Sequence, residues 1–338
     1  MEIADAMLMA AGLGTRLRPF TDACPKAVLP LMDVPVAQFA IDALDSAGIK
    51  NIVTNVHHHA ELAKRVLAEL DPGGAALRVS DESAELLGSA GGIKRALPFF
   101  GGRPFLLLNA DVLMDFDLAA LARAHARLRS RQGVHLTLAV LELPPSAGAY
   151  REIHVERDTG LISSFGEVVR GKPFFAGAAI LEPEALRLVP EGPADFLEMI
   201  LAPAVRAGKA GAYRVAGLWR DVGSPELWHR AHLDLMDKLE TGALNPRVRG
   251  RLERSNRRIT QGVWVSKRAP VFLGRKNWNS PCYWAPEQGS SRSEIRAQVP
   301  RELGAGAILY GNALPGMSAA VGSPWIGFGG HCQRLESV

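Results

Sequence analysis

The sequence has little cysteine and no long apolar run. Its three cysteines, Cys24, Cys282 and Cys332, lie far apart, and none belongs to a CxxC spacing. This pattern argues against a disulfide framework and against a cysteine-rich zinc site, and it fits a reducing compartment. No apolar stretch approaches the ~20 residues that a membrane helix needs, and the acidic start of the chain does not resemble a signal peptide. We therefore expect a cytoplasmic protein that has no membrane partner.

An excess of charge of one sign is also missing. The formal net charge is +4 over 338 residues, which is mild, and 47% of the residues are hydrophobic. This composition is typical of a globular protein with a full core, and the length allows two domains. A run of six arginines at 247–258 is offset by Glu253. Because the run lacks interleaved aromatic residues, it indicates a solvated linker or a cationic strip at a domain edge, and we expect no nucleic-acid partner.

Up to about residue 240, short apolar runs alternate with segments of helical period. This pattern predicts an α/β fold with a mostly parallel central sheet. The predicted strands are Ala6–Ala10, Ile52–Val56, Ala76–Val79, Phe105–Leu108, Leu136–Leu141, Ile153–Glu156, Phe175–Leu181 and Ala212–Val215. The predicted helices are Val36–Ala47, Ala60–Leu70, Gly91–Leu97, Leu118–Leu128 (with Asp117 as its cap), Phe196–Ala207 and Pro225–Leu239.

The pattern changes after residue 240, and no long helical period follows Gly262. Short pieces such as Val263-Trp264-Val265 alternate apolar residues with glycine and other small residues. They predict a small, irregular β-solenoid, similar to a left-handed β-helix. We therefore divide the chain into an α/β domain at 1–240 and a β-rich domain at 241–338. We expect the second domain to be structural and to offer a surface for a homo-oligomer.

The first predicted strand leads into a glycine-rich turn, Ala11-Gly12-Leu13-Gly14-Thr15-Arg16. Glycine lets backbone N–H groups approach a phosphate without a Cβ in the way. A dinucleotide-binding turn would need a third glycine where this chain has Leu17, and a P-loop would need Gly-Lys-Ser/Thr. Arg16 and Lys26 suggest two cations over a polyphosphate. The alternative is a tight turn with solvated surface charges.

Three consecutive histidines, His57-His58-His59, follow the second predicted strand. Successive residues at a strand end point to alternating sides, so the three side chains cannot readily bind one ion. A structural zinc site would also need further ligands at regular spacing, and the sequence has none. We therefore predict a polar loop before the next helix, with a metal site as the alternative.

The stretch from Met9 to Thr21 (MAAGLGTRLRPFT), followed by Pro25-Lys26-Ala27-Val28-Leu29-Pro30, resembles the signature of the sugar-1-phosphate nucleotidylyltransferase family. Mannose-1-phosphate guanylyltransferases and N-acetylmuramate-1-phosphate uridylyltransferases belong to that family. The resemblance covers roughly the first two-thirds of the chain and implies a Rossmann-like nucleotidyltransferase domain. It also implies transfer of a nucleotidyl group from an NTP to a sugar 1-phosphate, with release of pyrophosphate.

The resemblance assigns roles to particular residues. Arg16 would hold the leaving pyrophosphate, and Lys26 would contact the phosphate at the reacting centre. The segment Leu87-Gly88-Ser89-Ala90-Gly91-Gly92 resembles the part that receives the base and ribose, although Ser89 stands where threonine is commoner. By itself, this segment is also typical of a helix start. The implied nucleotide-binding residues are Ala11, Gly12, Gly14, Thr15, Gly88, Ser89 and Asn109.

Two aspartates, Asp111 and Asp221, lie in segments that resemble the metal-binding segments of the family. They would meet if both follow neighbouring strands, because open α/β sheets bind ligands at the strands' carboxyl ends. Mg²⁺ prefers oxygen ligands and is usually bound by one or two carboxylates together with substrate phosphates. The resemblance therefore implies a Mg²⁺ cofactor on this pair. By itself, each aspartate is also typical of a turn or a helix cap.

The sugar side resembles the family less closely. The strand at Phe175–Leu181 is similar to the one whose glycine lies against the sugar, which implies Gly177. Glu167 matches the glutamate of the family's Glu-Lys-Pro, but the nearest Lys-Pro here starts at Lys172, so the sugar-phosphate lysine stays open. GTP and UTP are both open as donors, and mannose-, heptose- and N-acetylmuramate 1-phosphate as acceptors. The alternative function is a regulatory subunit that binds a sugar nucleotide without catalysis.

Overall fold

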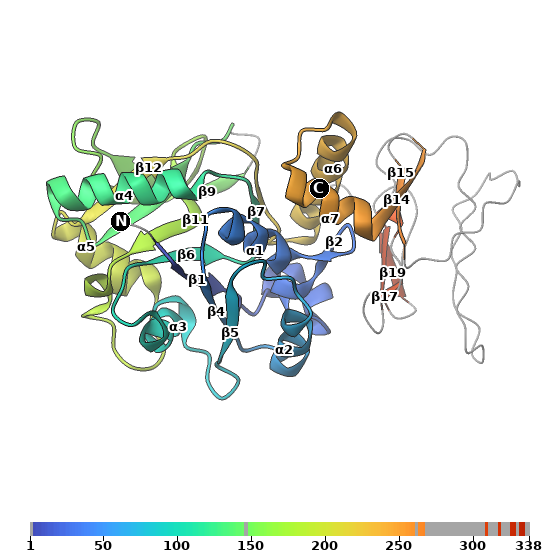
Figure 1. Cartoon of the computed structure of the whole chain (residues 1–338), viewed down its shortest axis with the longest axis horizontal. Helices are drawn as coiled ribbons and strands as arrows, with labels where there is room; N and C mark the ends of the chain where they lie inside the picture. Colours follow the sequence, from blue (N-terminus) through green and yellow to red (C-terminus); the bar gives the residue numbers. More distant parts are fainter. Residues whose placement is uncertain are drawn as a thin grey trace, which may run out of the picture. The chain divides into compact units, whose positions relative to one another are not determined.

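The computed structural model describes residues 3–144, 148–260 and 263–267, and the backbone of four short strands between 308 and 334. The chain forms two compact units (Figure 1). The first comprises Met1–Val28 and Val36–Gly223, and the second comprises Leu29–Pro35 and Ser224–Val338. The division of the chain into functional domains at residue 240 stays a prediction.

A nine-stranded sheet runs through the described part of the first unit. Its order is β10-β9-β11-β6-β1-β4-β5, with β8 beside β11 and β12 beside β8. The strands are β1 (Asp5–Met9), β4 (Asn51–Val56), β5 (Ala76–Asp81), β6 (Phe105–Asn109), β8 (Leu136–Leu141), β9 (Ala149–Val155), β10 (Ile162–Arg170), β11 (Phe174–Leu181) and β12 (Ala210–Arg214).

The centre of this sheet is mostly parallel. Strands β5, β4, β1 and β6 are parallel neighbours, and β8 and β12 form a further parallel pair. Strand β11 runs antiparallel between β6 and β8, and β9 and β10 form an antiparallel hairpin. The predicted mixed α/β fold is thus confirmed. Because β1, β4 and β6 are parallel, their carboxyl ends at Met9, Val56 and Asn109 meet at one edge, where open α/β sheets bind ligands.

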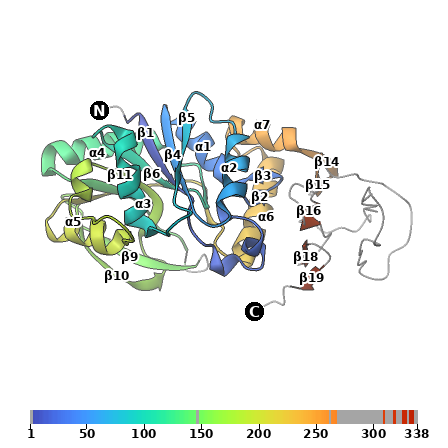
Figure 2. The same cartoon turned by 90° about the horizontal axis from the view of Figure 1, so that it is seen from below.

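Helices cover both faces of the sheet (Figures 1 and 2). On one face, Ile93 and Ala204 of two helices join a buried apolar cluster with Met7 of β1. On the other face, His125 Nδ1 of α4 lies 2.8 Å from Thr137 Oγ1 of β8. The helices of the first unit are α1 (Val36–Ser46), α2 (Ala60–Ala68), α3 (Gly88–Ala96), α4 (Leu118–Gln132) and α5 (Ala202–Arg206), the last preceded by a π-helical turn at Leu197–Leu201.

Local sequence explains several boundaries. The Asp117 side chain accepts a hydrogen bond from the N–H of Ala120 at 2.8 Å, so the predicted cap of α4 is confirmed. Helix α4 ends where Gly133 adopts a left-handed conformation (φ +64°), which a residue without a Cβ adopts at little cost. Strand β10 was not predicted from the sequence, because its polar and apolar residues do not alternate and most of them are exposed. It is a strand through its pairing with β9.

The described part of the second unit contains a short hairpin, β2 (Pro30–Leu31) and β3 (Val34–Pro35), and the helices α6 (Pro225–Thr241) and α7 (Pro246–Ser255). The linker interpretation of the arginine run is wrong, because most of that run lies in α7. The side chain of Asn245 caps this helix at the N–H of Val248, and Val248 and Leu252 are buried. Apolar residues one turn apart thus hold a helix whose other positions are largely basic.

The remaining described strands are short. Strand β14 (Asn256–Thr260) pairs with β15 (Val263–Ser266), which pairs with β16 (Ile308–Leu309), and the strands β17 (Met317–Ser318), β18 (Trp325–Phe328) and β19 (His331–Arg334) form a second small sheet. Most of the predicted β-solenoid falls outside the described residues, so the solenoid and its oligomer surface stay predictions. Within the part of the chain that the structure describes, no helix has the length and apolar character needed to cross a membrane.

Candidate functional site

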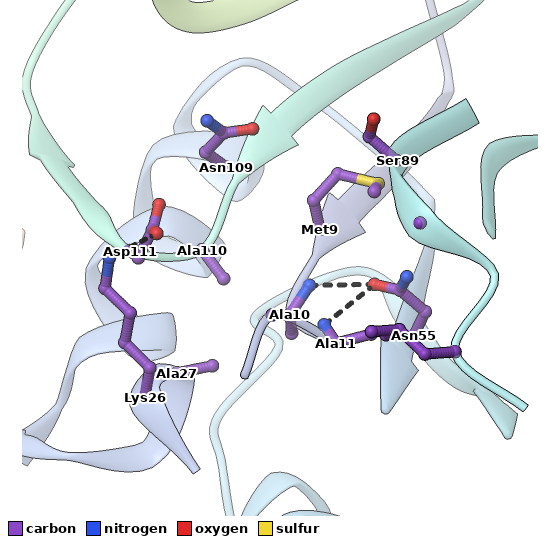
Figure 3. Close-up of a pocket in the computed structure, with 13 residues that line it drawn as sticks. Met9, Ala10, Ala11, Lys26, Ala27, Asn55, Ser89, Asn109, Ala110 and Asp111 are labelled. Carbon is purple, nitrogen blue, oxygen red and sulfur yellow. Dashed lines mark hydrogen bonds and ion pairs between the residues drawn. The ribbon is translucent and has the colours of Figure 1, made fainter. Parts of the chain in front are cut away.

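A cavity of about 290 Å³ opens at the edge where β1, β4 and β6 end (Figure 3). Five segments form it: the end of β1 with the start of the glycine loop, Lys26-Ala27, Asn55 of β4, the start of α3, and the end of β6 with the turn after it. The cavity therefore contains five of the seven predicted nucleotide-binding residues, together with two of the predicted catalytic residues. Its lining residues are Met9, Ala10, Ala11, Gly12, Lys26, Ala27, Asn55, Leu86, Gly88, Ser89, Asn109, Ala110 and Asp111.

Asn55, near the end of β4, holds the start of the glycine loop. Its Oδ1 accepts hydrogen bonds from the N–H of Ala10 at 2.8 Å and of Ala11 at 3.3 Å (Figure 3). Its Nδ2 donates to Glu82 Oε1 at 2.9 Å, so both ends of the amide are engaged and its orientation is fixed. Sequence reasoning missed Asn55 and Glu82 as site residues. The available signal for Asn55 was an amide side chain one residue before the end of a buried strand, at the ligand-binding edge.

Glu82 is fully buried near the start of α3. Burial raises the pKa of Glu82, while the hydrogen bonds from Asn55 and from the N–H of Leu87 lower it to a smaller extent. A Cβ at Gly92 would lie 2.7 Å from Glu82 Oε1 and 2.8 Å from Asn55 Nδ2. Glycine at position 92 therefore makes room for the Asn55–Glu82 pair.

The glycine loop turns at Gly14, which has a left-handed conformation with φ +63°. A Cβ there would lie 2.8 Å from Thr21 Cγ2 and 3.2 Å from Lys26 Cβ, so this position combines a positive φ with close packing. A 3₁₀ turn at Thr15–Leu17 follows, in which Leu17 is buried and Thr15 and Arg16 are exposed. These two exposed residues extend the loop beyond the cavity lining.

Lys26 joins the two predicted metal ligands. Its Nζ lies 2.5 Å from Asp111 Oδ2 and 3.8 Å from Asp221 Oδ1 (Figure 3 shows the first contact). Two short antiparallel strands, β7 (Val112–Met114) and β13 (Trp219–Asp221), bring these aspartates together, with Asp221 opposite Val112. The N–H of Val222 also donates to the backbone oxygen of Asp111 at 3.2 Å. A small sheet of two strands therefore places the carboxylates side by side.

Arg16 completes this charged group. Burial raises the pKa of Asp221, and the neighbouring Asp111 carboxylate raises it further, while Lys26 and Arg16 lower it. A Cβ at Gly223 would lie 2.9 Å from Arg16 Nη2 and 2.7 Å from Asp221 Oδ1. Glycine at position 223 thus lets the guanidinium approach the aspartates. The four residues predicted to be catalytic lie in one cluster.

The aspartate pair fits Mg²⁺ by the chemistry of its donors. Asp111 and Asp221 offer carboxylate oxygens close to one ammonium group, and Mg²⁺ usually takes one or two carboxylates and completes its shell with water and substrate phosphates. Within the described ranges, no group of three or more His, Cys, Asp or Glu residues is arranged to hold a metal ion. The pair would therefore depend on ligand oxygens to complete the coordination.

The start of α3 is held by the segment before the π-helical turn. The N–H groups of Ala90 and Gly91 donate to the backbone oxygen of Ala194 at 2.9 Å and 3.3 Å, and the hydroxyl of Ser89 accepts from the N–H of Phe196 at 2.8 Å. These contacts occupy N–H groups that a helix N-terminus would otherwise offer to an anion. The turn at Gly88 therefore suits a flat, uncharged part of a ligand better than a phosphate.

The predicted sugar residues are less well gathered. Gly177 has φ +83°, and a Cβ there would lie 3.3 Å from Asn109 Nδ2, so it lies beside one residue of the cavity wall. Glu167 is exposed in β10, at a shift of register between Phe165 and Val168, and Lys172 is exposed in the turn before β11. The cavity lining as described includes neither Glu167 nor Lys172.

Comparison with known proteins identifies a family to which this sequence is similar. The model of the nucleotidyl transferase family matches residues 5–238. The N-acetylmuramate alpha-1-phosphate uridylyltransferase of Neisseria meningitidis serogroup B is 34% identical over 226 residues, which cover 65% of this chain and 93% of that protein. The mannose-1-phosphate guanylyltransferase catalytic subunit beta of Danio rerio is 30% identical over 227 residues, 65% of this chain and 61% of that protein.

The fold has a counterpart among solved structures. The crystal structure of HddC from Yersinia pseudotuberculosis complexed with GMP-PN matches with a TM-score of 0.58 and 20% sequence identity, over 69% of this chain and 100% of that one. At this identity the likeness concerns the fold. It supports the mixed α/β architecture described above.

Proposed function

Because this chain belongs to the nucleotidyl transferase family, we propose that it transfers a nucleotidyl group from an NTP to a sugar 1-phosphate. The observation that carries the proposal is the cluster of Arg16, Lys26, Asp111 and Asp221 beside a cavity lined by the glycine loop. Two cations and two carboxylates at the edge of an α/β sheet suit a polyphosphate with a divalent cation. The named relatives act as uridylyl- and guanylyltransferases, which is the same reaction class.

In the proposed reaction, a phosphate oxygen of the sugar 1-phosphate attacks the α-phosphorus of the NTP. A new P–O bond forms, the bond between the α-phosphorus and the bridging oxygen to the β-phosphate breaks, and pyrophosphate leaves with that electron pair. The nucleophile is already an oxyanion, so the reaction needs no general base and we assign none. Catalysis then consists of positioning the substrates and neutralising charge.

Each residue of the cluster has a proposed role. Lys26 neutralises charge that builds on the α-phosphate, and Arg16 holds the leaving pyrophosphate with its planar fork. Asp111 and Asp221 would hold Mg²⁺. When bound, this ion supplies charge neutralisation and alignment for phosphate oxygens.

The cavity receives the nucleoside in this proposal. Gly88 and Ser89 are assigned to the base and ribose, Asn109 to the nucleotide, and the backbone of the loop (Ala11, Gly12, Gly14, Thr15) to the triphosphate. Gly177 and Glu167 are the proposed sugar residues, and a role for Lys172 stays open. The reaction would take place in the cytoplasm, and a homo-oligomer through the C-terminal region stays a prediction.

The experiment that tests this function is a matrix of NTPs against sugar 1-phosphates. Purified protein with Mg²⁺ is given each pair, including GTP and UTP with mannose, heptose and N-acetylmuramate 1-phosphates, and pyrophosphate release is measured. We expect release in one cell or a few related cells, which would name both substrates. A folded protein that binds nucleotide but releases no pyrophosphate with any acceptor would contradict catalysis and favour a regulatory subunit.

A further inference from the structure

The three histidines between β4 and α2 bind backbone oxygens. His57 Nδ1 lies 2.7 Å from the oxygen of Glu82, His58 Nε2 lies 2.9 Å from that of Thr21, and His59 Nε2 lies 2.9 Å from that of Asp22. Because a carbonyl oxygen accepts hydrogen bonds, each of these ring nitrogens carries a hydrogen and donates it. The predicted polar loop before α2 is confirmed.

Thr21 links one of these histidines to the glycine loop. Its side chain is buried, and its hydroxyl donates to the backbone oxygen of Gly14 at 2.8 Å. Its own carbonyl oxygen is the acceptor of His58. A Cβ at Gly14 would lie 2.8 Å from Thr21 Cγ2, so the turn rests directly on this side chain. Contacts therefore run from His58 through Thr21 to Gly14, two residues before Arg16.

The backbone of the histidine turn is arranged for these contacts. His59 has φ +48°, a left-handed conformation that is unfavourable for a residue with a Cβ. In an extended strand, His58 and His59 would point to opposite sides. Here both reach the 3₁₀ turn Phe20–Asp22, and their ring centroids lie 4.0 Å apart. An unfavourable backbone conformation is thus kept at a place where it directs two side chains to one loop.

We propose that His58 is a positioning residue that fixes the loop from Gly14 to Lys26, so that Arg16 and Lys26 point at the polyphosphate. The inference rests on the proposed function, because it takes the two cations as pyrophosphate and α-phosphate contacts. The loop crosses open surface at Arg16 and Arg18, which are exposed, and the histidine turn supports it from the protein side. Asn55, three residues earlier, holds the beginning of the same loop.

The test measures binding of inorganic pyrophosphate with Mg²⁺ by calorimetry, alongside turnover of NTP. We expect His58→Ala to weaken pyrophosphate binding about tenfold, the usual effect of one lost hydrogen bond of this kind. His58→Gln keeps an N–H donor and should restore binding to within about threefold of the wild type. His154→Ala, which removes a half-exposed histidine of β9, is the control and should bind pyrophosphate normally.

A second variant guards against loss of folding. Thr21→Val keeps the shape of the side chain and removes the hydroxyl bond to Gly14, and it should weaken binding to a similar extent. If His58 and Thr21 act through the same chain of contacts, the double variant should bind pyrophosphate no more weakly than the single variant with the lower affinity. Wild-type binding by His58→Ala, or no recovery in His58→Gln, would overturn the inference. Pyrophosphate binding that responds as expected in a protein without transferase activity would instead contradict the proposed function.

Discussion

Lys26 is the residue on which the proposed chemistry depends most. Its side chain is 9% exposed and contacts two carboxylates, so its charge is compensated within the protein. Placing an ammonium group out of water is costly unless it is paired, and both aspartates fulfil that need in the described structure. A bound α-phosphate with Mg²⁺ would add further charges of both signs to the same cluster. The lysine is therefore held in place before the substrate arrives.

Removing a charge from this cluster should impair turnover more than folding. We expect Lys26→Ala or Asp111→Asn to lower kcat by ~10²–10³, the usual effect of losing one preorganised contact to a transition state. Lys64→Met, which removes the ion pairs of Lys64 with Glu61 and Asp81, is the control and should retain nearly full activity. Steady-state kinetics measures turnover, and far-UV circular dichroism checks that each variant is folded. Near-normal kcat in either cluster variant would remove that residue from the mechanism.

At this scale, the sequence predicts residues that belong to a contiguous motif. Lys26 and Asp111 were assigned from segments that resemble the family's motifs, and the structure places the two side chains in contact. Asn55 and Glu82 were not predicted as site residues, because their role depends on a hydrogen bond between the ends of two strands. The local sequence does not distinguish a buried carboxylate that orients an amide from a carboxylate on the surface.

Among the elements, α3 depends on a close approach to the segment after residue 190. Gly91 lies so near that a Cβ there would be 2.2 Å from the backbone oxygen of Gly192, closer than real contacts allow. Either the helix or the segment would have to move to accept a side chain. Because Ser89 and Gly88 line the cavity from the same turn, such a movement would change the shape of the cavity.

Gly91→Ala tests this packing. We expect a loss of about 1–3 kcal/mol of stability from overpacking, which exceeds the ~1 kcal/mol that alanine contributes in a helix. Gly74→Ala is the matched control, since a Cβ there would meet neighbours at 3.7 Å. Urea unfolding at one pH compares the two variants with the wild type. A urea midpoint of Gly91→Ala at or above that of the wild type would show that the segment at Gly192 moves away from α3 at little cost.

The sequence predicts a helix or strand correctly where burial gives it a pattern of apolar residues. Prediction fails where strand pairing or a few helix contacts determine the element. Strands β1, β6 and β8 are largely apolar and almost entirely buried, and the predicted bounds of each lie within one residue of the observed ones. Strand β10 and helix α7 were not predicted, because β10 is largely exposed and α7 carries two buried apolar positions among many arginines. The antiparallel direction of β11 also has no local signature, since it follows from the connection between strands.

At the scale of the whole molecule, buried histidines make stability depend on pH. His232 of α6 is fully buried, and this burial lowers its pKa to about 3 from an ordinary value of 6.5. Its Nδ1 donates to the backbone oxygen of Trp228 at 2.9 Å, which suits the neutral ring. Below pH 6.5 the unfolded chain takes up a proton at this site and the folded chain does not. Stability is therefore complete above pH 6.5 and falls as the pH decreases toward 3.

We expect His232 to cost the protein about 2 kcal/mol of unfolding free energy between pH 7 and pH 5, at ~1.4 kcal/mol for each pH unit below 6.5. His232→Gln should remove this part of the loss. His125 and His229, whose pKa values burial also lowers, add to the slope in both proteins. Urea midpoints at pH 7 and pH 5 give the difference. Equal losses in wild type and variant would contradict a neutral, buried His232.

Transfer of the α-phosphorus of an NTP to a sugar 1-phosphate can be followed with a labelled NTP. The protein, Mg²⁺, an NTP labelled at the α-phosphate and the matching sugar 1-phosphate are mixed, and the labelled product is separated from pyrophosphate. We expect one labelled NDP-sugar for each pyrophosphate released, and no labelled product without the sugar phosphate. Label that appears in NMP or NDP at the same rate with and without the sugar phosphate would contradict it.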